Sequence, residues 1–359
     1  MILITGGAGF VGSNLAISLA ERHPDREIVA LDNLHRRGSE LNPPRLERAG
    51  VRFVQGDVRE PGDLARLGGV SALVECSAEP SALSGVDGDT SFVFQTNLVG
   101  AYNCLELARR EGAFMLFLST SRVYPISALN GLLYDEDETR FELRADQTTP
   151  GASEAGISET FPVGGARTLY GTTKLAAELL IEEYRDMFGQ GAVVDRCGVI
   201  AGPWQMGKVD QGVFTHWLLS HRFGLPLSYI GYGGEGKQVR DLLHVEDLAA
   251  LIEEQLDDPE RWDGQVVNVG GGKDHSLSLL ETTALCRELT GNEVPISAER
   301  EVRPGDVPIY ISDCARLFER TAWRPRHSPR DTLADINEWV DGHAVELQRS
   351  LGIGVGRAR

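Results

Sequence analysis

Basic residues are scarce in this 359-residue sequence relative to acidic ones. Lysine and arginine number 35 against 53 aspartates and glutamates, which gives a formal charge of −18. A surface with this excess of negative charge repels nucleic-acid phosphates and anionic lipid headgroups. We therefore expect no nucleic-acid partner and no membrane partner. An anionic ligand must be held by a few local cations and backbone amides.

Paired cysteines, signal segments and metal motifs are also missing. The chain has five widely spaced cysteines without a C-x-x-C motif, at positions 76, 104, 197, 286 and 314. This usage indicates buried thiols in a reducing, cytoplasmic setting. No basic segment leads into a long apolar run near Met1, so we expect neither secretion nor a membrane span. The histidines form no H-x-H or H-E-x-x-H pattern, so we predict no metal site and interpret His244 as a structural or capping residue.

Short apolar runs alternate with helical stretches along the first 200 residues and beyond. We expect strands at residues 1–5, 27–32, 51–57, 71–77, 114–120, 191–196 and 265–272, and helices at 10–22, 89–111, 168–188, 242–256 and 330–347. Strands that are continuously apolar and separated by helices indicate a parallel sheet covered on both faces. The predicted fold class is α/β, with a Rossmann-type doubly wound sheet and a smaller mixed α/β C-terminal lobe.

The regular alternation ends after Gly202 and Pro203. We predict that residues 1–200 form the first domain, completed by 241–269, and that 201–240 and 270–347 form the smaller lobe. The polar stretch 125–168 is rich in Gly, Thr and Pro, and a connection of this length is usually a lid or a binding loop. The last residues, from 352 on, are expected to fray.

A glycine-rich turn, "ITGGAGFVGSNL", joins the first strand to the first helix. Gly6 would permit a tight turn, Gly9 would let phosphates approach the backbone, and Gly12 would allow close packing of the helix. Helix amides at such a junction bind a pyrophosphate. We therefore predict a dinucleotide site, with Phe10 and Val11 in the first helical turn as further cofactor-binding residues.

Acidic residues follow the next two strands. Asp32 ends the second strand, where a carboxylate accepts hydrogen bonds from the adenosine ribose and repels a 2′-phosphate, which favours NAD over NADP. Arg36 and Arg37 weaken that preference, because either could reach a phosphate. "GDV" at 56–58 fits the edge of an adenine pocket. The predicted cofactor residues here are Asn33, Arg36, Asp57 and Val58, together with Asp32.

A tyrosine and a lysine lie one helical turn apart in "GARTLYGTTKLAAE". Tyr170 and Lys174 are about 40° apart around a helix axis. An ammonium beside a phenol favours the phenolate, so we expect a Tyr170 pKa lowered towards neutrality. The strand that ends at Ser119 and Thr120 places both residues at the ligand crevice of a parallel sheet. Tyr170 could then remove a proton from a sugar hydroxyl while hydride leaves the same carbon.

These motifs together resemble the extended short-chain dehydrogenases/reductases, specifically the NAD-dependent nucleotide-sugar epimerases and dehydratases. The matching segments are "TGGAGFVGS", "DNL", "GDV", "NLVGAYN", "STSRVY", Tyr170-x-x-x-Lys174, "RDLLHVEDLA", "NVGGG" and "RPGD". The resemblance implies a catalytic triad of Thr120, Tyr170 and Lys174, and cofactor contacts from Ser77, Asn97, Ser119, Tyr170 and Lys174. It implies that Arg240 and Arg303 bind the substrate diphosphate and Asp306 its ribose. It also implies a homodimer through helices 89–111 and 168–188.

A narrower set of segments is similar to the CDP-paratose 2-epimerases. These are "DNLHRRG", "DETRF", "GKVDQGVF", "GKQVRDLLHVEDL" and "SLSLLE". Three positions depart from the common pattern of the broader family. "ECSAE" brings Glu75 and Glu79 to the end of the fourth strand, "RCGV" continues the sixth, and Pro125 follows the "VY" pair.

The residues after Thr120 discriminate between reactions. Sugar 4,6-dehydratases of this family place Asp-Glu there, and sugar-acid decarboxylases have Glu at the second position, whereas this chain has Ser121 and Arg122. Epimerisation needs only reversible oxidation, so we predict an NAD-dependent epimerase. The resemblance to the CDP-paratose 2-epimerases implies that it acts at C2 of a CDP-hexose. The alternatives are a UDP-sugar 4-epimerase, a dehydratase or reductase of the same family, and a catalytically silent NAD-binding sensor.

Overall fold

The computed structural model describes residues 1–86, 88–207 and 211–352. The predicted fraying of the tail beyond residue 352, and the centre of "GKVDQGVF", lie outside the described residues.

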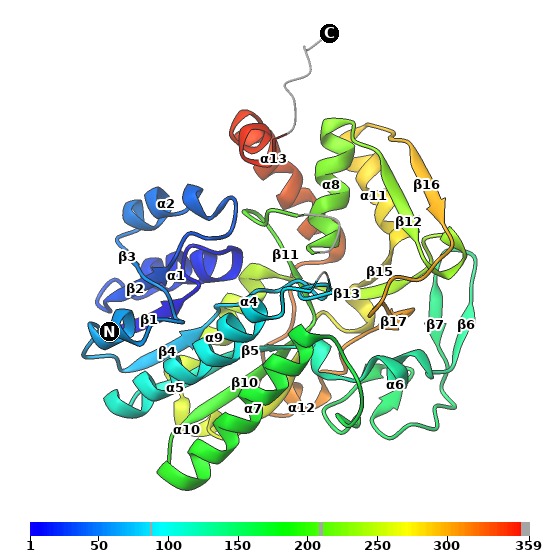
Figure 1. Ribbon diagram of the computed structural model, residues 1–359. Helices are drawn as coiled ribbons and strands as arrows, with labels where there is room; N and C mark the ends of the chain where they lie inside the picture. Colours follow the sequence, from blue (N-terminus) through cyan, green and yellow to red (C-terminus); the bar gives the residue numbers. More distant parts are fainter. Residues whose placement is uncertain (87, 208–210, 353–359) are drawn as a thin grey trace.

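Seven parallel strands form the central sheet, in the order β14-β10-β5-β4-β1-β2-β3 (Figure 1). The strands are β1 (Ile2–Thr5), β2 (Ile28–Asp32), β3 (Arg52–Gln55), β4 (Ala72–Glu75), β5 (Phe114–Thr120), β10 (Ala192–Cys197) and β14 (Val266–Val269). All seven coincide with the apolar runs, and the order reverses direction beside β1, as in a doubly wound sheet. The predicted Rossmann-type fold class is confirmed.

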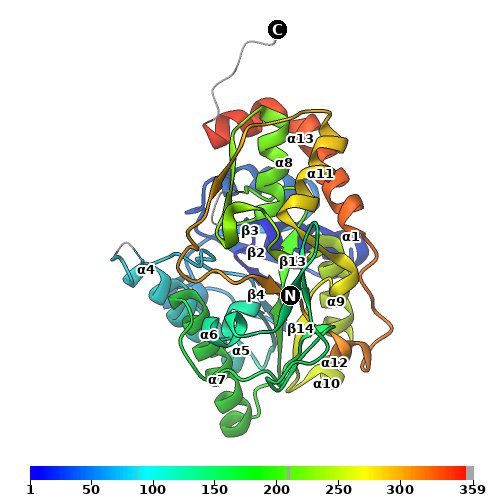
Figure 2. The same cartoon turned by 90° about the vertical axis from the view of Figure 1, so that its right-hand side faces the viewer.

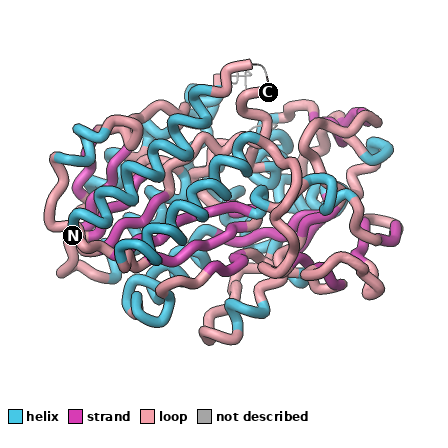
Figure 3. Tube along the Cα trace, turned by 60° about the horizontal axis from the view of Figure 1, so that its bottom comes forward, coloured by secondary structure: helices cyan, strands magenta, loops and turns pink. Residues whose placement is uncertain are grey.

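Helices cover both faces of this sheet, as Figure 3 shows. Strand residues alternate between the two faces. Ile2 and Ile4 of β1 pack with α1 (Phe10–Arg22), α2 (Pro43–Arg48) and α9 (Val245–Asp257). Leu3 between them packs with α3 (Pro61–Ala65), α5 (Gly100–Glu111) and α7 (Leu169–Phe188). Strands buried on both faces explain why the runs are apolar throughout.

A second lobe lies to the right of the central sheet in Figure 1, and its helices stand together at the top of Figure 2. Its core packs α8 (Val213–Phe223), α11 (Leu279–Thr290) and α13 (Pro329–Leu351) around Phe214, Leu333 and Ile336. One sheet pairs β12 (Leu227–Ile230) with β16 (Ile296–Glu299), and another joins β11 (Val199–Ala201), β13 (Val239–His244), β15 (Ser276–Ser278) and β17 (Ile309–Tyr310). Because β14 of the central sheet lies between β13 and β15 in the chain, the chain crosses between the lobes more than once.

Two predicted helices differ from those observed. The helix expected over 242–256 begins at Val245, because residues 239–244 form β13 and His244 caps the helix that follows. An apolar run of this kind fits a buried strand as well as a helix, so the pattern could not place the boundary. The helix expected over 89–111 consists of α4 (Ser91–Phe94), a π-helical segment η2 (Gln95–Val99) and α5.

The stretch 125–168 is built of short elements. It contains α6 (Ile126–Asn130), the hairpin of β6 (Tyr134–Glu136) and β7 (Phe141–Leu143), and the hairpin of β8 (Ala152–Ser153) and β9 (Gly156–Ile157). Its scattered apolar residues bury against Val239 and Tyr310 of the second lobe. None of its residues lines the cavity described below, so the predicted lid or binding loop is wrong. The remaining short helices are η1 (Ser39–Leu41), η3 (Ser121–Val123), η4 (Tyr232–Gly234), η5 (Lys273–His275), α10 (Pro259–Trp262) and α12 (Ala315–Phe318).

Candidate active site

The glycine turn has the geometry of a dinucleotide-binding turn. Gly6 has φ +61°, a conformation in which a side chain is strained. A Cβ on Gly12 would lie 2.2 Å from the Gly6 carbonyl oxygen, so only glycine lets α1 start this close to the turn. Gly9, the N-cap of α1, gives no side-chain hydrogen bond to the first helical turn. The helix amides, including those of Phe10 and Val11, can therefore receive a pyrophosphate.

Asp32 is fixed at the carboxyl end of β2 by two backbone amides. Its Oδ2 accepts a hydrogen bond from the Ala8 amide at 3.1 Å, and its Oδ1 accepts one from the Leu34 amide at 2.8 Å. Burial raises the pKa of this carboxyl, and the two amides act against that rise. The side chain thus joins the glycine turn to the loop after β2, where it can meet a ribose.

The other polar residues predicted around the adenosine form hydrogen bonds with side chains of the protein. The Asn33 Nδ2 donates to Asp57 Oδ2 at 2.9 Å. Although burial acts to raise it, the pKa of Asp57 is about 2, because Arg59 and Asn33 donate hydrogen bonds to the carboxylate. Val58 is buried. Arg36 donates to the side chain of Gln211 in the second lobe, so this arginine connects the two lobes.

A cavity of about 810 Å³ opens between the sheet edge and the second lobe. Its lining includes nine of the predicted site residues, namely Phe10, Val11, Ser119, Thr120, Tyr170, Lys174, Arg240, Arg303 and Asp306. The second lobe adds apolar residues that the sequence did not single out, namely Phe214, Trp217, Leu227, Leu277 and Leu279, together with polar ones such as Gln205, His216, Gln238 and Glu299. "GKVDQGVF" and "SLSLLE" contain three of these residues, so the segments similar to 2-epimerases could have pointed to this part of the cavity wall. The volume is within the range of small-molecule sites.

Close packing of two turns brings Thr120 to Tyr170. Helix α7 begins after the N-cap Thr168, whose Oγ1 accepts a hydrogen bond from the Gly171 amide at 3.2 Å. A Cβ on Gly171 would lie 2.0 Å from the Arg122 carbonyl oxygen, so the first turn of α7 rests on the turn that follows β5. Thr120, at the end of β5, is 7% exposed and shares a hydrogen bond with the Tyr170 side chain. The residue after Tyr170 must therefore be small.

The ionisation of Tyr170 differs from the expected one. Burial raises the pKa of Tyr170 above its ordinary value, although the Lys174 ammonium and the Thr120 hydroxyl act to lower it. The expectation of a lowered Tyr170 pKa is wrong. Desolvation of the phenolate outweighs a single nearby ammonium.

That ammonium also has an acidic partner. Lys174 Nζ lies 3.4 Å from Glu75 Oε2, and the two side chains are 2% and 1% exposed. The ammonium also lies 4.1 Å from the centre of the Phe117 ring. Burial raises the pKa of the Glu75 carboxyl, and Lys174 acts against that rise. The unusual glutamate at the end of β4 is therefore bonded directly to the predicted catalytic lysine.

Three residues predicted as cofactor contacts have other partners in the structure. The Ser119 hydroxyl donates to Glu178, which forms an ion pair with Arg196 at 2.7 Å. The Asn97 side chain accepts from the Glu79 amide at 2.7 Å and donates to Thr173 Oγ1 at 3.2 Å. These bonds hold the loop after β4 against α7. Ser77 lies buried in that loop, and its backbone amide donates a hydrogen bond to the Glu75 carboxylate.

The predicted substrate residues meet at the far end of the cavity. Arg240 forms an ion pair with Asp306 at 2.7 Å, and Arg303 precedes it by three residues in the same loop. Arg122 enters the cavity wall as well, and its guanidinium donates to the Gly305 carbonyl at 2.8 Å. Burial lowers the pKa of Arg122, an effect that the nearby Arg240 strengthens. Three guanidinium groups therefore border the space where an anionic substrate would bind.

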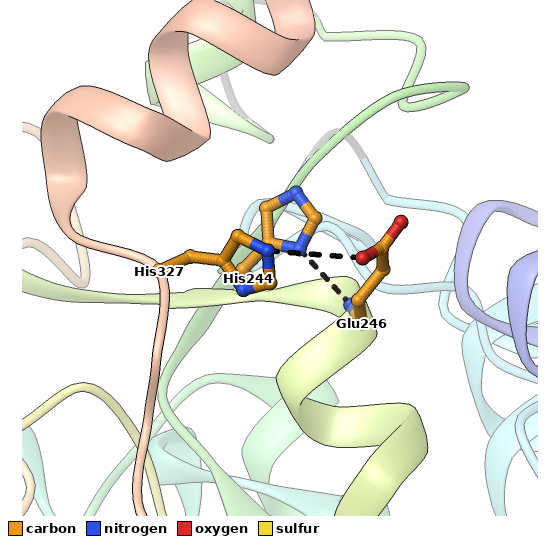
Figure 4. A group of neighbouring side chains, drawn as sticks. All are labelled: His244, Glu246 and His327. Atoms are coloured by element: carbon orange, nitrogen blue, oxygen red, sulfur yellow. Dashed lines mark hydrogen bonds and ion pairs between the residues drawn. The ribbon is translucent and has the colours of Figure 1, made fainter.

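A pair of histidines lies apart from the cavity lining. His244 and His327 stack with ring centres 4.1 Å apart beside Glu246, as Figure 4 shows. His244 caps α9, because its Nδ1 accepts the Glu246 amide at 3.1 Å. That bond places the imidazole proton on Nε2, so His244 has no lone pair left for a metal ion. The capping role predicted for His244 is confirmed, and the cluster does not fit a metal site.

The comparison with known proteins decides the family. Residues 2–270 match the NAD dependent epimerase/dehydratase family. The chain belongs to this family. It is an NAD-dependent enzyme, and the glycine turn, the free helix amides and Asp32 fit that cofactor.

Several family members are similar over nearly their whole length. The chain is 29% identical to CDP-paratose 2-epimerase of Salmonella typhi over 351 residues, which cover 94% of this chain and 98% of that protein. A dTDP-glucose 4,6-dehydratase of Streptomyces venezuelae, solved with NAD, superposes with a TM-score of 0.77 at 27% identity over 98% of this chain and 99% of that one. The UDP-glucose 4-epimerase of Thermus thermophilus, solved with NAD, superposes with a TM-score of 0.76 at 25% identity over 95% of this chain and 99% of that one. Among the described residues, no helix is long and apolar enough to cross a membrane.

Proposed function

We propose that this enzyme epimerises C2 of a CDP-hexose. The proposal depends on one arrangement, in which Thr120, Tyr170 and Lys174 line the cavity while Ser121 and Arg122 stand where dehydratases have carboxylates. Removal of water from a sugar needs an acid and a base beside the catalytic threonine. Without that pair, reversible oxidation and return of hydride is the simplest chemistry for this site. The similarity to CDP-paratose 2-epimerase supports the choice of base and carbon.

Each residue of the proposed triad has a role in this reaction. Bound NAD supplies a reversible acceptor for the hydride of C2. Tyr170 takes the proton of the C2 hydroxyl, and the Thr120 hydroxyl orients both oxygens. Lys174 holds the nicotinamide ribose and favours the phenolate. When hydride has left, C2 is planar, and the keto-sugar must turn so that hydride and proton return to its opposite face.

Such a turn requires a tightly held nucleotide and a loosely held sugar. Arg240 and Arg303 would grip the diphosphate, and Asp306 would accept a ribose hydroxyl. Phe214 and Trp217 form an apolar part of the cavity wall, which would not hold the hexose by side-chain oxygen atoms. Anchoring at one end and an apolar surface at the other would allow the rotation.

The decisive experiment is incubation with CDP-, UDP- and GDP-hexoses in ordinary and deuterated water, followed by NMR. A 2-epimerase that returns its own hydride should invert C2 of a CDP-hexose without solvent deuterium at that carbon. Inversion of C4 in a UDP-sugar would favour the alternative 4-epimerase, with the same triad acting on another hydroxyl. Deuterium at C2 would indicate enolisation and contradict the mechanism. Bound cofactor without turnover of any sugar would support a sensor instead.

The assembly and location are proposed as well. We propose a homodimer through α5 and α7, which lie side by side and expose Tyr102, Leu179, Met187 and Phe188 by 43 to 65%. An apolar surface of this kind is typical of an interface. We propose residues 1–200 with 241–269 as the NAD-binding domain, and 201–240 with 270–347 as the substrate lobe. The five free cysteines, four of them buried, fit a cytoplasmic enzyme.

A further inference from the structure

The proposed reaction gives Lys174 a role but leaves its buried ionic partner, Glu75, without one. Lys174 comes from α7, and Glu75 comes from the end of β4, which lies directly beside β5 in the central sheet. Their 3.4 Å contact lies almost entirely out of solvent. At this depth water screens charges poorly, so each group strongly affects the ionisation of its neighbours.

We propose that Glu75 is a positioning residue whose carboxylate holds the Lys174 ammonium and offsets its positive charge beside Tyr170 and the nicotinamide. The inference rests on the proposed roles of Tyr170 and Lys174, and is independent of which sugar is the substrate. Glu75 does not line the cavity itself and reaches it only through Lys174, which does.

The groups around this pair leave Glu75 as the acidic partner of the lysine. Lys174 Nζ faces the Phe117 ring on β5 and the Glu75 carboxylate on β4. The thiols of Cys76 and Cys104 also lie near this pair. Around Tyr170 lie Lys174, the Thr120 hydroxyl, Arg122 and the Cys197 thiol. The second carboxylate oxygen of Glu75, Oε1, is buried without a hydrogen-bond partner among the described residues. The Glu75 carboxylate is therefore held by the Lys174 ammonium and the Ser77 backbone amide, and it orients the ammonium in turn.

Two consequences follow from a negative charge at this place. The first concerns the phenol: Glu75 weakens the field by which Lys174 favours the phenolate, so Tyr170 keeps its proton to higher pH. The second concerns the cofactor, whose nicotinamide ring is positively charged when oxidised and neutral when reduced. A buried anion near that ring favours NAD⁺ over NADH. An epimerase that must start every cycle with NAD⁺ benefits from this bias.

The test compares Glu75→Gln with the wild type as purified, cofactor-loaded enzymes. The near-ultraviolet absorbance of tyrosinate is followed against pH, and the same titration of Y170F variants in each background is subtracted. Loss of the carboxylate should move the Tyr170 titration to lower pH by about one unit. The ratio of the dissociation constants for NAD⁺ and NADH should rise about tenfold in E75Q, since NAD⁺ loses its favourable anion. Neither readout requires turnover, so the result does not depend on the proposed substrate.

Two further variants complete the design. Asp195→Asn removes another fully buried carboxylate, one bonded to Gln255 of α9, and should change neither readout. Glu75→Asp keeps the negative charge and should restore the wild-type titration and cofactor ratio at least in part; it also serves if E75Q fails to fold. Wild-type values in E75Q, or equal changes in D195N, would overturn the proposal and leave Glu75 with a packing role.

Discussion

Arg240 and Asp306, which the sequence assigns to different parts of one substrate, form an ion pair with each other at 2.7 Å. The ion pair is mostly buried, with 14% and 24% of the two side chains exposed. The Asp306 carboxylate balances the positive charge of the Arg240 guanidinium, and both residues line the cavity. Binding of a diphosphate therefore exchanges one anionic partner of Arg240 for another.

Arg240→Lys should weaken nucleotide binding. A lysine keeps the charge but loses the planar fork that grips a phosphate and Asp306 together. We expect the dissociation constant for CDP, measured by calorimetry, to rise about tenfold, a loss of about 1.4 kcal/mol. Arg330→Lys is the matched control, because Arg330 pairs with Glu288 on the surface. Equal CDP affinity in R240K and the wild type would argue against the assigned diphosphate site.

Tyr170→Phe should abolish most turnover while leaving cofactor binding intact. Removing a general base costs about 10²- to 10⁴-fold in rate. The kcat of Y170F should fall by that factor, with little change in the amount of NAD released on denaturation. Tyr184→Phe provides the control on the same helix, since its hydroxyl binds Glu106 at 2.6 Å. A kcat within about threefold of the wild type would rule out Tyr170 as the base.

The His244 cap should make the fold sensitive to acid. Burial, together with the neighbouring His327, lowers the pKa of His244 from 6.5 to about 4. Because the unfolded chain binds the proton more readily, the free energy of unfolding should fall as pH drops from 6.5 to about 4. His244→Asn keeps a capping oxygen and cannot titrate. Denaturant unfolding should show a loss over that range smaller by about 2 kcal/mol in H244N. Parallel stability curves for the two proteins would contradict this assignment.

Leu179→Glu should convert the proposed dimer to a monomer. Leu179 lies on α7 with 56% of its surface exposed, among other apolar side chains of that helix. A buried carboxylate at an interface costs several kcal/mol. Light scattering should give about half the wild-type mass. Val345→Glu is the control, because Val345 is 61% exposed on α13, away from these helices. A wild-type protein that is already monomeric at working concentration would refute the dimer.

Much of this architecture could be read from local patterns. The seven strands were predictable because each is buried on both faces and therefore apolar throughout. The turn at Gly6 and Gly12 was predictable because backbone geometry there admits only glycine. The start of α9 was not predictable, since the segment "LLH" before it is equally compatible with a strand and with a helix. The stretch 125–168 was also misjudged, because its hairpins are stabilised by contacts with residues more than 70 positions away, such as Val239 and Tyr310.

The sequence by itself determined the fold class, the cofactor turn and the tyrosine–lysine spacing, because these depend on residues close together in the chain. Only the tertiary structure decided how those groups are charged. It placed Glu75 of one strand against Lys174 of a helix 99 positions later, and it buried Tyr170 enough to raise its pKa. Electrostatic energy depends on distance and burial, and neither quantity is written in the order of the residues.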